Sequence, residues 1–198
     1  TGDAEKVFKG TQELERELIG LCAEQIFDGL PGEQDGYIAS GGTEANIQEL
    51  WIYRNYFMKV NKARIDEIGV IYSEDSHYSF AKGTNLLNIL PIVIKVDENT
   101  REILLPDLER KIKDAQANGI KYFIVNMNLS TTMFGSIDDI DKITSLLIEN
   151  NIIFKLHVDA ALGGFSYPFT NPQSKFTFKN PYITSITIDA HKMMQTPY

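Results

Sequence analysis

The sequence predicts an α/β fold with a mostly parallel sheet and helices on both faces. Short apolar segments alternate with longer segments of helical periodicity along the chain, which is the order of elements in βαβ units. Several apolar segments, such as residues 120–128, are nearly continuous, as in strands whose two faces are both covered. Together these two observations favour a layered α/β domain over an all-helical or all-β one.

The predicted elements follow one another from residue 9 to residue 189. The first two helices each have apolar residues on one face, including Leu14, Leu18 and Leu21 in the first and Leu50 and Trp51 in the second. The predicted helices cover residues 9–27, 43–57, 76–89, 106–119 and 136–151, and the predicted strands cover residues 69–72, 91–97, 120–128, 152–160 and 183–189.

Two of these helices carry sequence signals at their ends. Pro106 lies in the first turn of one helix and Gly119 follows its last turn, which is the usual placement of both residues. Ser136 is predicted to cap the N-terminus of the next helix, with Asp139 three residues later as in a capping box. These signals separate the strands on either side of each helix.

The composition argues against several classes of partner. The chain has 198 residues, of which 43% are hydrophobic, and a formal net charge of −8, as in an ordinary globular domain. The sequence has no basic stripe, so nucleic acid and an anionic membrane surface are disfavoured. Its apolar runs are too short to cross a bilayer. The single cysteine, Cys22, excludes an internal disulfide and favours a reducing, cytoplasmic location.

Glycines and hydroxyl residues lie next to the predicted helices and strands. Gly41 and Gly42 permit a tight bend and the close approach of a ligand, and Thr43 opens a helix whose free N–H groups favour an anion. A plain glycine turn with a threonine cap is the ordinary alternative. After a later strand, Thr131 and Thr132 could offer hydroxyls to a ligand or satisfy their own loop.

Ionisable side chains follow three of the strands. His77 could stack on a flat ring or transfer a proton, Asp159 is a carboxylate at the end of a buried strand and needs a partner, and Lys192 could form a Schiff base with an aldehyde. Each also has an ordinary explanation, as a hydrogen-bonded histidine, a turn-capping aspartate and a surface lysine. Because ligands bind at the carboxyl ends of parallel strands, we expect these side chains to converge there.

One ligand accounts for all of these positions. It needs a phosphate for the glycine–threonine turn, an aldehyde for Lys192, a flat ring between His77 and Ala161, and a basic ring nitrogen for Asp159. Pyridoxal 5′-phosphate has these features, and a lysine with an acidic partner for the pyridinium nitrogen is the recurring requirement of this cofactor. The sequence therefore predicts a pyridoxal phosphate site.

Five motifs carry these residues: SGGTEAN, SHYSFAKG, STTMFGSID, HVDAALGGF and SITIDAHKM, in this order. Their combination resembles the group II pyridoxal-phosphate-dependent amino acid decarboxylases, which include glutamate, aromatic amino acid, histidine and archaeal tyrosine/aspartate decarboxylases. The resemblance extends from Gly10 to the last residue, and the run from HVDAALGGF to SITIDAHKM looks most similar to the archaeal tyrosine/aspartate decarboxylases.

The resemblance implies a contact with the cofactor for one residue set, in which Lys192, His77 and Asp159 are catalytic. In this set Gly42 and Thr43 would contact the phosphate, His77 and Ala161 would cover the ring faces, Thr131 would lie near the ring, Asp159 would pair with the ring nitrogen, Asp189 and His191 would lie near the phosphate and the Schiff base, and Lys192 would carry the aldehyde.

The resemblance also implies a reaction and an architecture. The reaction is decarboxylation of an L-amino acid to its amine, with no metal, and the nearest alternative is a carbon–carbon lyase of the sphingosine-phosphate lyase type. The architecture is the large domain of a fold type I pyridoxal-phosphate enzyme over residues 1–198, with an N-terminal segment and a C-terminal small domain expected outside it. Relatives of this kind are expected to form homodimers with shared active sites.

Two positions depart from the family pattern. Ser130 stands where many relatives of the resembled family have a glycine before the threonine pair, so this loop is expected to be shifted slightly next to Thr131. Asp189 stands where aromatic amino acid decarboxylases tend to have asparagine, and an anion beside a phosphate needs a bridging donor.

Overall fold

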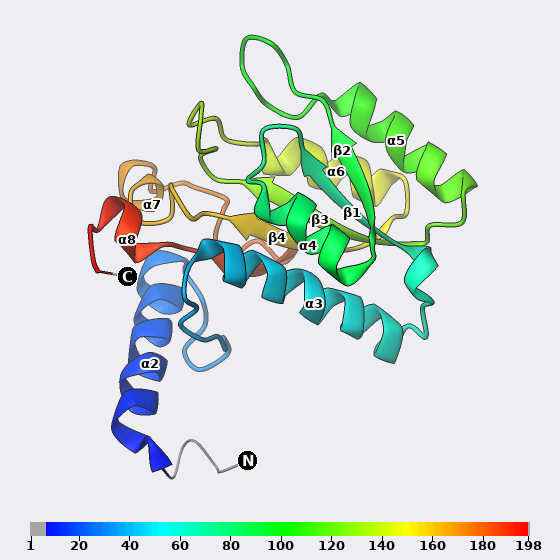
Figure 1. Cartoon of the computed structure of the whole chain (residues 1–198). Helices are drawn as coiled ribbons and strands as arrows, with labels where there is room; N and C mark the ends of the chain where they lie inside the picture. Colours follow the sequence, from blue (N-terminus) through cyan, green and yellow to red (C-terminus); the bar gives the residue numbers. More distant parts are fainter. Residues whose placement is uncertain (1–6, 198) are drawn as a thin grey trace.

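A computed structural model describes residues 7–197 as a five-stranded parallel sheet flanked by helices (Figure 1). Residues 1–6 and 198 of the predicted domain lie outside the described part. The strands stand in the order β2-β1-β3-β4-β5, and all their pairings are parallel. Their bounds are β1 (Ile68–Ser73), β2 (Leu90–Ile94), β3 (Tyr122–Asn128), β4 (Ile153–Asp159) and β5 (Ile183–Thr187).

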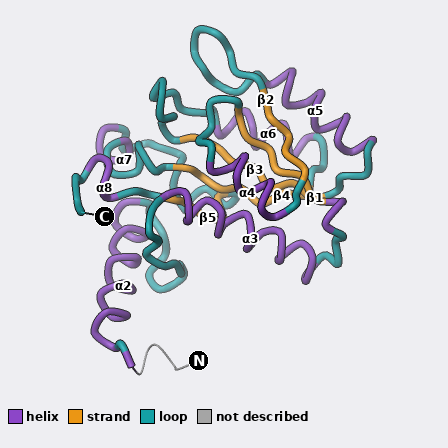
Figure 2. Tube along the Cα trace, in the orientation of Figure 1, coloured by secondary structure: helices purple, strands orange, loops and turns teal. Residues whose placement is uncertain are grey.

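Helices cover both faces of the sheet, which confirms the predicted fold class (Figure 2). Helices α3 and α4 pack on one face, where their buried side chains meet those of β1 and β3. Helices α5 and α6 pack on the other face, against β1, β3 and β4. The bounds of the helices are α2 (Lys9–Leu21), a π-helical turn (Cys22–Ile26), α3 (Gly42–Val60), a 3₁₀ turn (Ile65–Glu67), α4 (Ser79–Leu87), α5 (Leu105–Ala117), α6 (Ile140–Glu149), α7 (Tyr167–Thr170) and α8 (Ala190–Met193).

The N-terminal cap of α6 differs from the prediction. Asp139, not Ser136, is the cap, because its Oδ1 accepts the backbone N–H of Lys142 at 3.1 Å. The hydroxyl of Ser136 instead lies 2.7 Å from that of Thr131. The prediction was wrong because two acidic residues follow Ser136, and the sequence does not show which polar side chain meets the free N–H groups.

The apolar faces predicted for the first two helices are only partly buried. Leu50 is fully buried, but Trp51 is 44% exposed, because it turns away from the sheet on the outer side of α3. Leu14, Leu18 and Leu21 are all exposed, and α2 extends away from the sheet (Figure 1). Helical spacing therefore identified the helices but did not determine which residues they bury.

The strand order brings the predicted site residues to one edge of the sheet. β1 pairs with β2 on one side and with β3 on the other, so the chain reverses its direction of travel at β1. Parallel sheets bind ligands at the carboxyl end of such a switch point. His77 and Thr131 follow β1 and β3, Asp159 ends β4, and Lys192 follows β5.

Among the described helices, the structure shows none that is both long enough and apolar enough to cross a membrane.

Candidate active site

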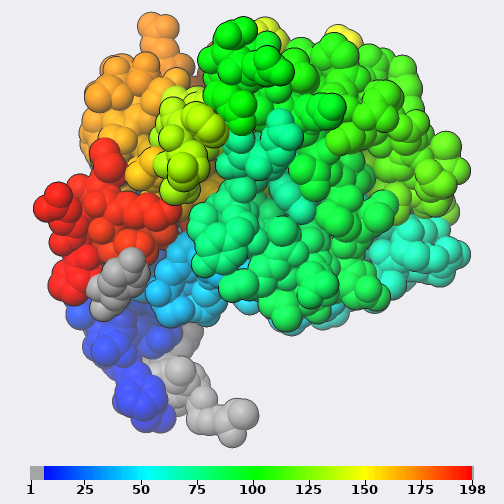
Figure 3. Space-filling view, turned by 45° about the horizontal axis from the view of Figure 1, so that its top comes forward, coloured from blue at the N-terminus to red at the C-terminus, as the bar shows by residue number. Residues whose placement is uncertain are grey.

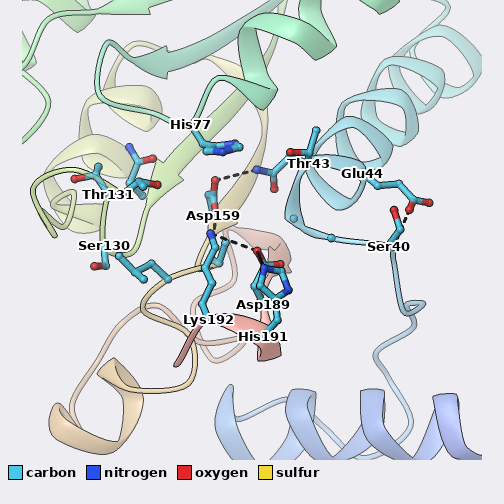
Figure 4. Close-up of a pocket in the computed structure, with 17 residues that line it drawn as sticks. Ser40, Thr43, Glu44, His77, Ser130, Thr131, Asp159, Asp189, His191 and Lys192 are labelled. Carbon is cyan, nitrogen blue, oxygen red and sulfur yellow. Dashed lines mark hydrogen bonds and ion pairs between the residues drawn. The ribbon is translucent and has the colours of Figure 1, made fainter. Parts of the chain in front are cut away.

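A cavity of about 340 Å³ lies at the carboxyl edge of the sheet (Figure 4), within the size range of small-molecule sites. Its walls come from segments far apart in the sequence. On the surface, the C-terminal segment in red lies beside α2 in blue and the yellow-green loop that follows β3 (Figure 3). Every predicted site residue lines this cavity, namely Gly42, Thr43, His77, Thr131, Asp159, Ala161, Asp189, His191 and Lys192.

The glycine turn brings the N-terminus of α3 to the cavity. Gly41 has φ 156° and ψ 168°, a conformation that glycine adopts almost alone. A Cβ on Gly42 would lie 2.7 Å from the carboxylate of Asp189, so this position also excludes a side chain. Glu44 closes the turn by accepting the backbone N–H of Ser40 at 2.8 Å. The turn thus leaves the first N–H groups of a long helix at the cavity wall, which is favourable for an anion.

Asp159 presents a buried carboxylate to the cavity. Its Oδ1 accepts the backbone N–H of Ala161 at 3.1 Å, and its Oδ2 accepts the amide of Asn46 at 2.9 Å. Burial raises the pKa of Asp159, while the two donors, Lys192 and His77 act in the opposite direction. A carboxylate has room for further donors, so Asp159 can accept one more hydrogen bond from a ligand in the cavity.

Lys192 points into the cavity rather than into open water. Its Nζ lies 3.3 Å from Oδ2 of Asp189, and 27% of its side chain is exposed. Figure 4 shows the amine beneath Asp159. His191 lies 3.6 Å from the same Asp189 oxygen. The carboxyl of Asp189 thus lies between two basic side chains, which can act as the hydrogen-bond donors that the sequence analysis required beside a phosphate.

His77 lies on the opposite side of the cavity from Lys192 (Figure 4). Its Nδ1 lies 2.9 Å from the hydroxyl of Ser79, and its ring packs against Tyr78 with 4.2 Å between ring centroids. Burial lowers the pKa of His77, with a smaller opposing effect of Asp159. A neutral imidazole is therefore available to cover a flat ring or to exchange a proton.

The loop after β3 has a more complex role than predicted. The hydroxyl of Thr131 is bonded to Ser136 within the loop, so it lines the cavity while satisfying its own backbone turn. Ser130 has φ 78°, in the left-handed region that favours glycine, so the structure gives a physical reason for the glycine expected here from the family pattern. Asn128 also lines the cavity and was missed. Its amide is held by Asp138 at 2.9 Å.

Asn46 is another cavity residue that sequence reasoning missed, as are Ser40, Glu44 and Leu162. It lies one turn into α3, is 1% exposed and contacts Asp159 directly. A signal for it exists in the sequence, because Asn46, Glu49 and Tyr53 recur at a spacing of three to four residues. That spacing places polar residues on the buried side of a helix, which is uncommon unless they have partners.

The residues of this cavity fit pyridoxal 5′-phosphate. The helix N-terminus behind Gly42 suits the phosphate, the buried Asp159 suits a protonated ring nitrogen, and Lys192 offers an amine to the aldehyde. The donors that already hold Asp159 leave it able to accept a hydrogen bond from the ring. The individual roles of these residues stay predictions.

Comparison with known proteins shows the family of the chain. The family model of the pyridoxal-dependent decarboxylase conserved domain matches residues 13–198. The chain is 49% identical to a tryptophan decarboxylase of Clostridium sporogenes over 98% of the chain and 47% of that protein. It is 37% identical to a probable L-tyrosine/L-aspartate decarboxylase of Methanothrix thermoacetophila over 96% of the chain and 45% of that protein. The sequence identity to the tryptophan decarboxylase is thus higher than that to this archaeal enzyme, whereas the motifs had looked most similar to the archaeal group.

One solved structure with the same fold is a lyase and not a decarboxylase. Sphingosine-1-phosphate lyase of Burkholderia pseudomallei matches 98% of the chain and 44% of its own length, with a TM-score of 0.76 and 22% identity. At that identity the match shows the fold alone, and solved decarboxylase structures share the same fold type I architecture. The chain spans about half the length of the curated relatives it matches. By its family model and its identity to these relatives, the chain belongs to the pyridoxal-dependent decarboxylases.

Proposed function

We propose that this chain forms the cofactor-binding part of an enzyme that removes CO₂ from an L-amino acid. The observation that carries the proposal is one cavity lined by the Lys192 amine, the Asp159 carboxylate and the N-terminus of α3. Family membership supports the same reaction. The proposal concerns the whole protein, because the matched relatives are about twice as long as the chain.

The residues of the cavity divide the proposed chemistry among them. Pyridoxal 5′-phosphate, when bound, supplies an electron sink for the pair released as the bond between Cα and the carboxylate breaks. Asp159 would keep a proton on the ring nitrogen, and Lys192 would hold the aldehyde through Nζ. His77 would cover the ring and exclude water on that side. Lys192 and His77 would be the groups that return a proton to Cα.

We propose an L-amino acid with an aromatic side chain as the substrate. The support is the identity to a tryptophan decarboxylase, which is higher than that to the probable L-tyrosine/L-aspartate decarboxylases. The test offers the purified protein with pyridoxal 5′-phosphate a panel of L-amino acids and measures amine and CO₂ in equal amounts. We expect tryptophan, tyrosine or phenylalanine to react fastest. If none of the amino acids in the panel yields an amine, the proposal is contradicted.

The lyase alternative has no observation that favours it over decarboxylation. The structural match shows the fold only, whereas the curated relatives above 30% identity that we compared are named decarboxylases. A lyase would break the bond between Cα and Cβ and release an aldehyde without CO₂. The same product measurement therefore separates the two reactions.

We further propose a cytoplasmic homodimer. The single Cys22 supports a reducing compartment, and the dimer follows from the family resemblance. Light scattering of the purified protein tests the dimer, and a monomer that is fully active would contradict shared active sites.

A further inference from the structure

Helix α3 has a polar side that faces the sheet beneath the cavity. Asn46, Glu49 and Tyr53 lie on this side and are 1%, 5% and 6% exposed. Apolar residues would stabilise the fold better at such positions, because buried polar groups cost free energy unless they are fully bonded. These polar residues of α3 therefore do more than pack against the sheet. The hydrogen bonds of Asn46 indicate their function.

Asn46 uses both hydrogens of its amide on groups that reach the cavity. Its Nδ2 donates to Oδ2 of Asp159 at 2.9 Å and to the hydroxyl of Ser79 at 3.0 Å. Its Oδ1 lies 3.3 Å from Nε2 of His157. A primary amide has two N–H donors and one accepting oxygen, so these partners fix its orientation. A rotation by 180° would place its oxygen against the Asp159 carboxylate.

The amide oxygen determines the tautomer of His157. Because that oxygen can only accept, the hydrogen of the neutral ring is on Nε2. Burial lowers the pKa of His157 to about 3, so the ring is neutral. Its Nδ1 then accepts from the hydroxyl of Ser185 at 2.6 Å, and Ser185 in turn accepts from Tyr53 at 2.6 Å. The hydrogen bonds thus run in one direction, from Tyr53 through Ser185, His157 and Asn46 to Asp159.

The second amide hydrogen of Asn46 orients the Ser79 hydroxyl toward His77. Ser79 accepts from Asn46, so its own O–H is free to donate to Nδ1 of His77 at 2.9 Å. The backbone N–H of Ser79 also points at Nδ1, at 3.3 Å. Two donors at Nδ1 leave the ring hydrogen on Nε2. His77 therefore offers an N–H, not a lone pair, at its other nitrogen.

We propose that Asn46 is a positioning residue. Through the two N–H groups of one amide, it holds Asp159 as a hydrogen-bond acceptor and turns the Ser79 hydroxyl toward Nδ1 of His77 on the opposite side of the cavity. The inference deepens the proposed decarboxylation and rests on it for its purpose. The hydrogen-bond path itself is a property of the cofactor-free protein. It predicts that the hydrogen bonds of two cavity groups, Asp159 and His77, depend on Asn46.

The sharpest test replaces the amide by a carboxyl of the same shape. In Asn46→Asp at pH 8, the new carboxylate accepts from the Ser79 hydroxyl and repels Asp159, so Nδ1 of His77 loses that hydroxyl and keeps only the backbone N–H of Ser79. The nitrogen-15 signal of Nδ1 should shift accordingly. At pH 6 the introduced carboxyl takes up a proton and regains a donor, so the Ser79 hydroxyl and this signal should return. The charged and titratable groups around Asp159 that also enter this titration are Glu49, His77 and Lys192.

Nitrogen-15 NMR of the imidazole rings measures these tautomers without cofactor or turnover. The chain has three histidines, so the spectrum is simple. In the unsubstituted protein we expect His77 and His157 to carry the hydrogen on Nε2. Hydrogen on Nδ1 of either ring would overturn the proposal, and this measurement needs no variant. Ser79→Ala, which interrupts only the branch to His77, serves if Asn46→Asp does not fold.

Affinity for pyridoxal 5′-phosphate, measured by absorbance titration, gives the second readout. We expect the Kd of Asn46→Asp to rise roughly tenfold or more at pH 8, because a hydrogen bond to a charged group is lost, and to recover at pH 6. Asn46→Ala should show a loss that does not depend on pH. Asn126→Asp is the matched control, because Asn126 is 1% exposed on β3 and bonds only weakly, at 3.5 Å, to Ile71.

The outcomes separate this inference from the proposed function. A Kd for Asn46→Asp that equals that of Asn126→Asp at both pH values would overturn the role of Asn46. Failure of the unsubstituted protein to bind pyridoxal 5′-phosphate would instead contradict the proposed function, while the tautomers of the free protein would still support or overturn the path from Asn46.

Discussion

Along β4, the two faces of the sheet bury different chemistry, while nearer β1 the α3 face also holds an apolar cluster. On the face covered by α5 and α6, Leu156 and Val158 of β4 pack into an apolar core with side chains such as Leu147. On the face covered by α3, the alternate residues of the same strand, His157 and Asp159, meet a row of polar groups. Successive side chains of a strand point to opposite faces, so one strand serves both.

This difference separates stability from chemistry. The apolar face removes hydrocarbon from water and stabilises the fold. The polar face includes Glu49, whose carboxylate oxygens have no hydrogen-bond partner among the described residues. Substitutions on the first face should change the free energy of unfolding and leave the site intact. Substitutions of the polar residues on the second face should change the site, and substitution of Glu49 should increase the free energy of unfolding.

The largest effect is expected where the polar face opens into the cavity. Lys192→Ala removes the amine that would hold the cofactor aldehyde, and activity should fall by roughly 10⁴-fold or more. The visible absorbance of the cofactor-bound protein should disappear with it. Amine release and the absorbance spectrum are measured together. Lys179→Ala, which breaks only an exposed ion pair with Asp28, is the control, and retained turnover in Lys192→Ala would contradict the assignment.

The next effect concerns the other end of the cavity. Asp159→Asn keeps the shape of the side chain but removes the charge that would hold the ring nitrogen protonated. Activity should fall by roughly 10³-fold, equivalent to about 4 kcal/mol, and the cofactor should bind more weakly. Unfolding in urea should show a loss of stability of about 1–3 kcal/mol, because the new amide NH2 faces one of the two N–H donors that Asp159 accepts from. A variant with normal turnover would show that the carboxylate is not needed.

On the apolar face, Leu147→Ala should act on stability alone. Leu147 is fully buried between α6 and the sheet, so its truncation should lower the free energy of unfolding by about 3 kcal/mol. The Kd for pyridoxal 5′-phosphate should not change in conditions where the variant is folded. Urea unfolding and absorbance titration measure the two quantities. A weakened Kd in the folded variant would show that the two faces are coupled.

The smallest effect is expected for the carboxyl without a partner. Burial, with a further contribution from Asp159, raises the pKa of Glu49 well above its ordinary value. The folded state therefore binds a proton that the unfolded state releases, so the free energy of unfolding falls as the pH rises above the ordinary glutamate value. Glu49→Met should remove this slope and stabilise the protein at pH 8 by about 2 kcal/mol.

Urea unfolding of Glu49→Met and of the unsubstituted protein at pH 5 and pH 8 measures the slope. Glu49→Gln is the companion variant, since it removes the titration but keeps a buried polar group. We expect it to lose the pH dependence without gaining the full stability. An unchanged slope in Glu49→Met would mean that Glu49 does not titrate in this range.

Much of the site followed from local sequence. Each predicted cavity residue lies at the end of a strand, in the segment that follows one, or at the start of α3. Strand ends can be recognised from apolar runs and glycines. The alternation of strands and helices then places these ends at one edge of a parallel sheet. The cap of α6 was misassigned, because Ser136 and Asp139 are both good caps and only the loop conformation selects between them.

The sequence by itself determined the α/β class, the order of the elements and the residues that gather at the cavity, because these depend on periodicity and on motifs within a few residues. Only the tertiary structure decided which side chains hold them in place. Asn46 and Asp159 are separated by 113 positions, and Asn46 and Ser79 by 33. A hydrogen bond across such a distance exists only after α3 has packed on the sheet, since it depends on the approach and orientation of both partners.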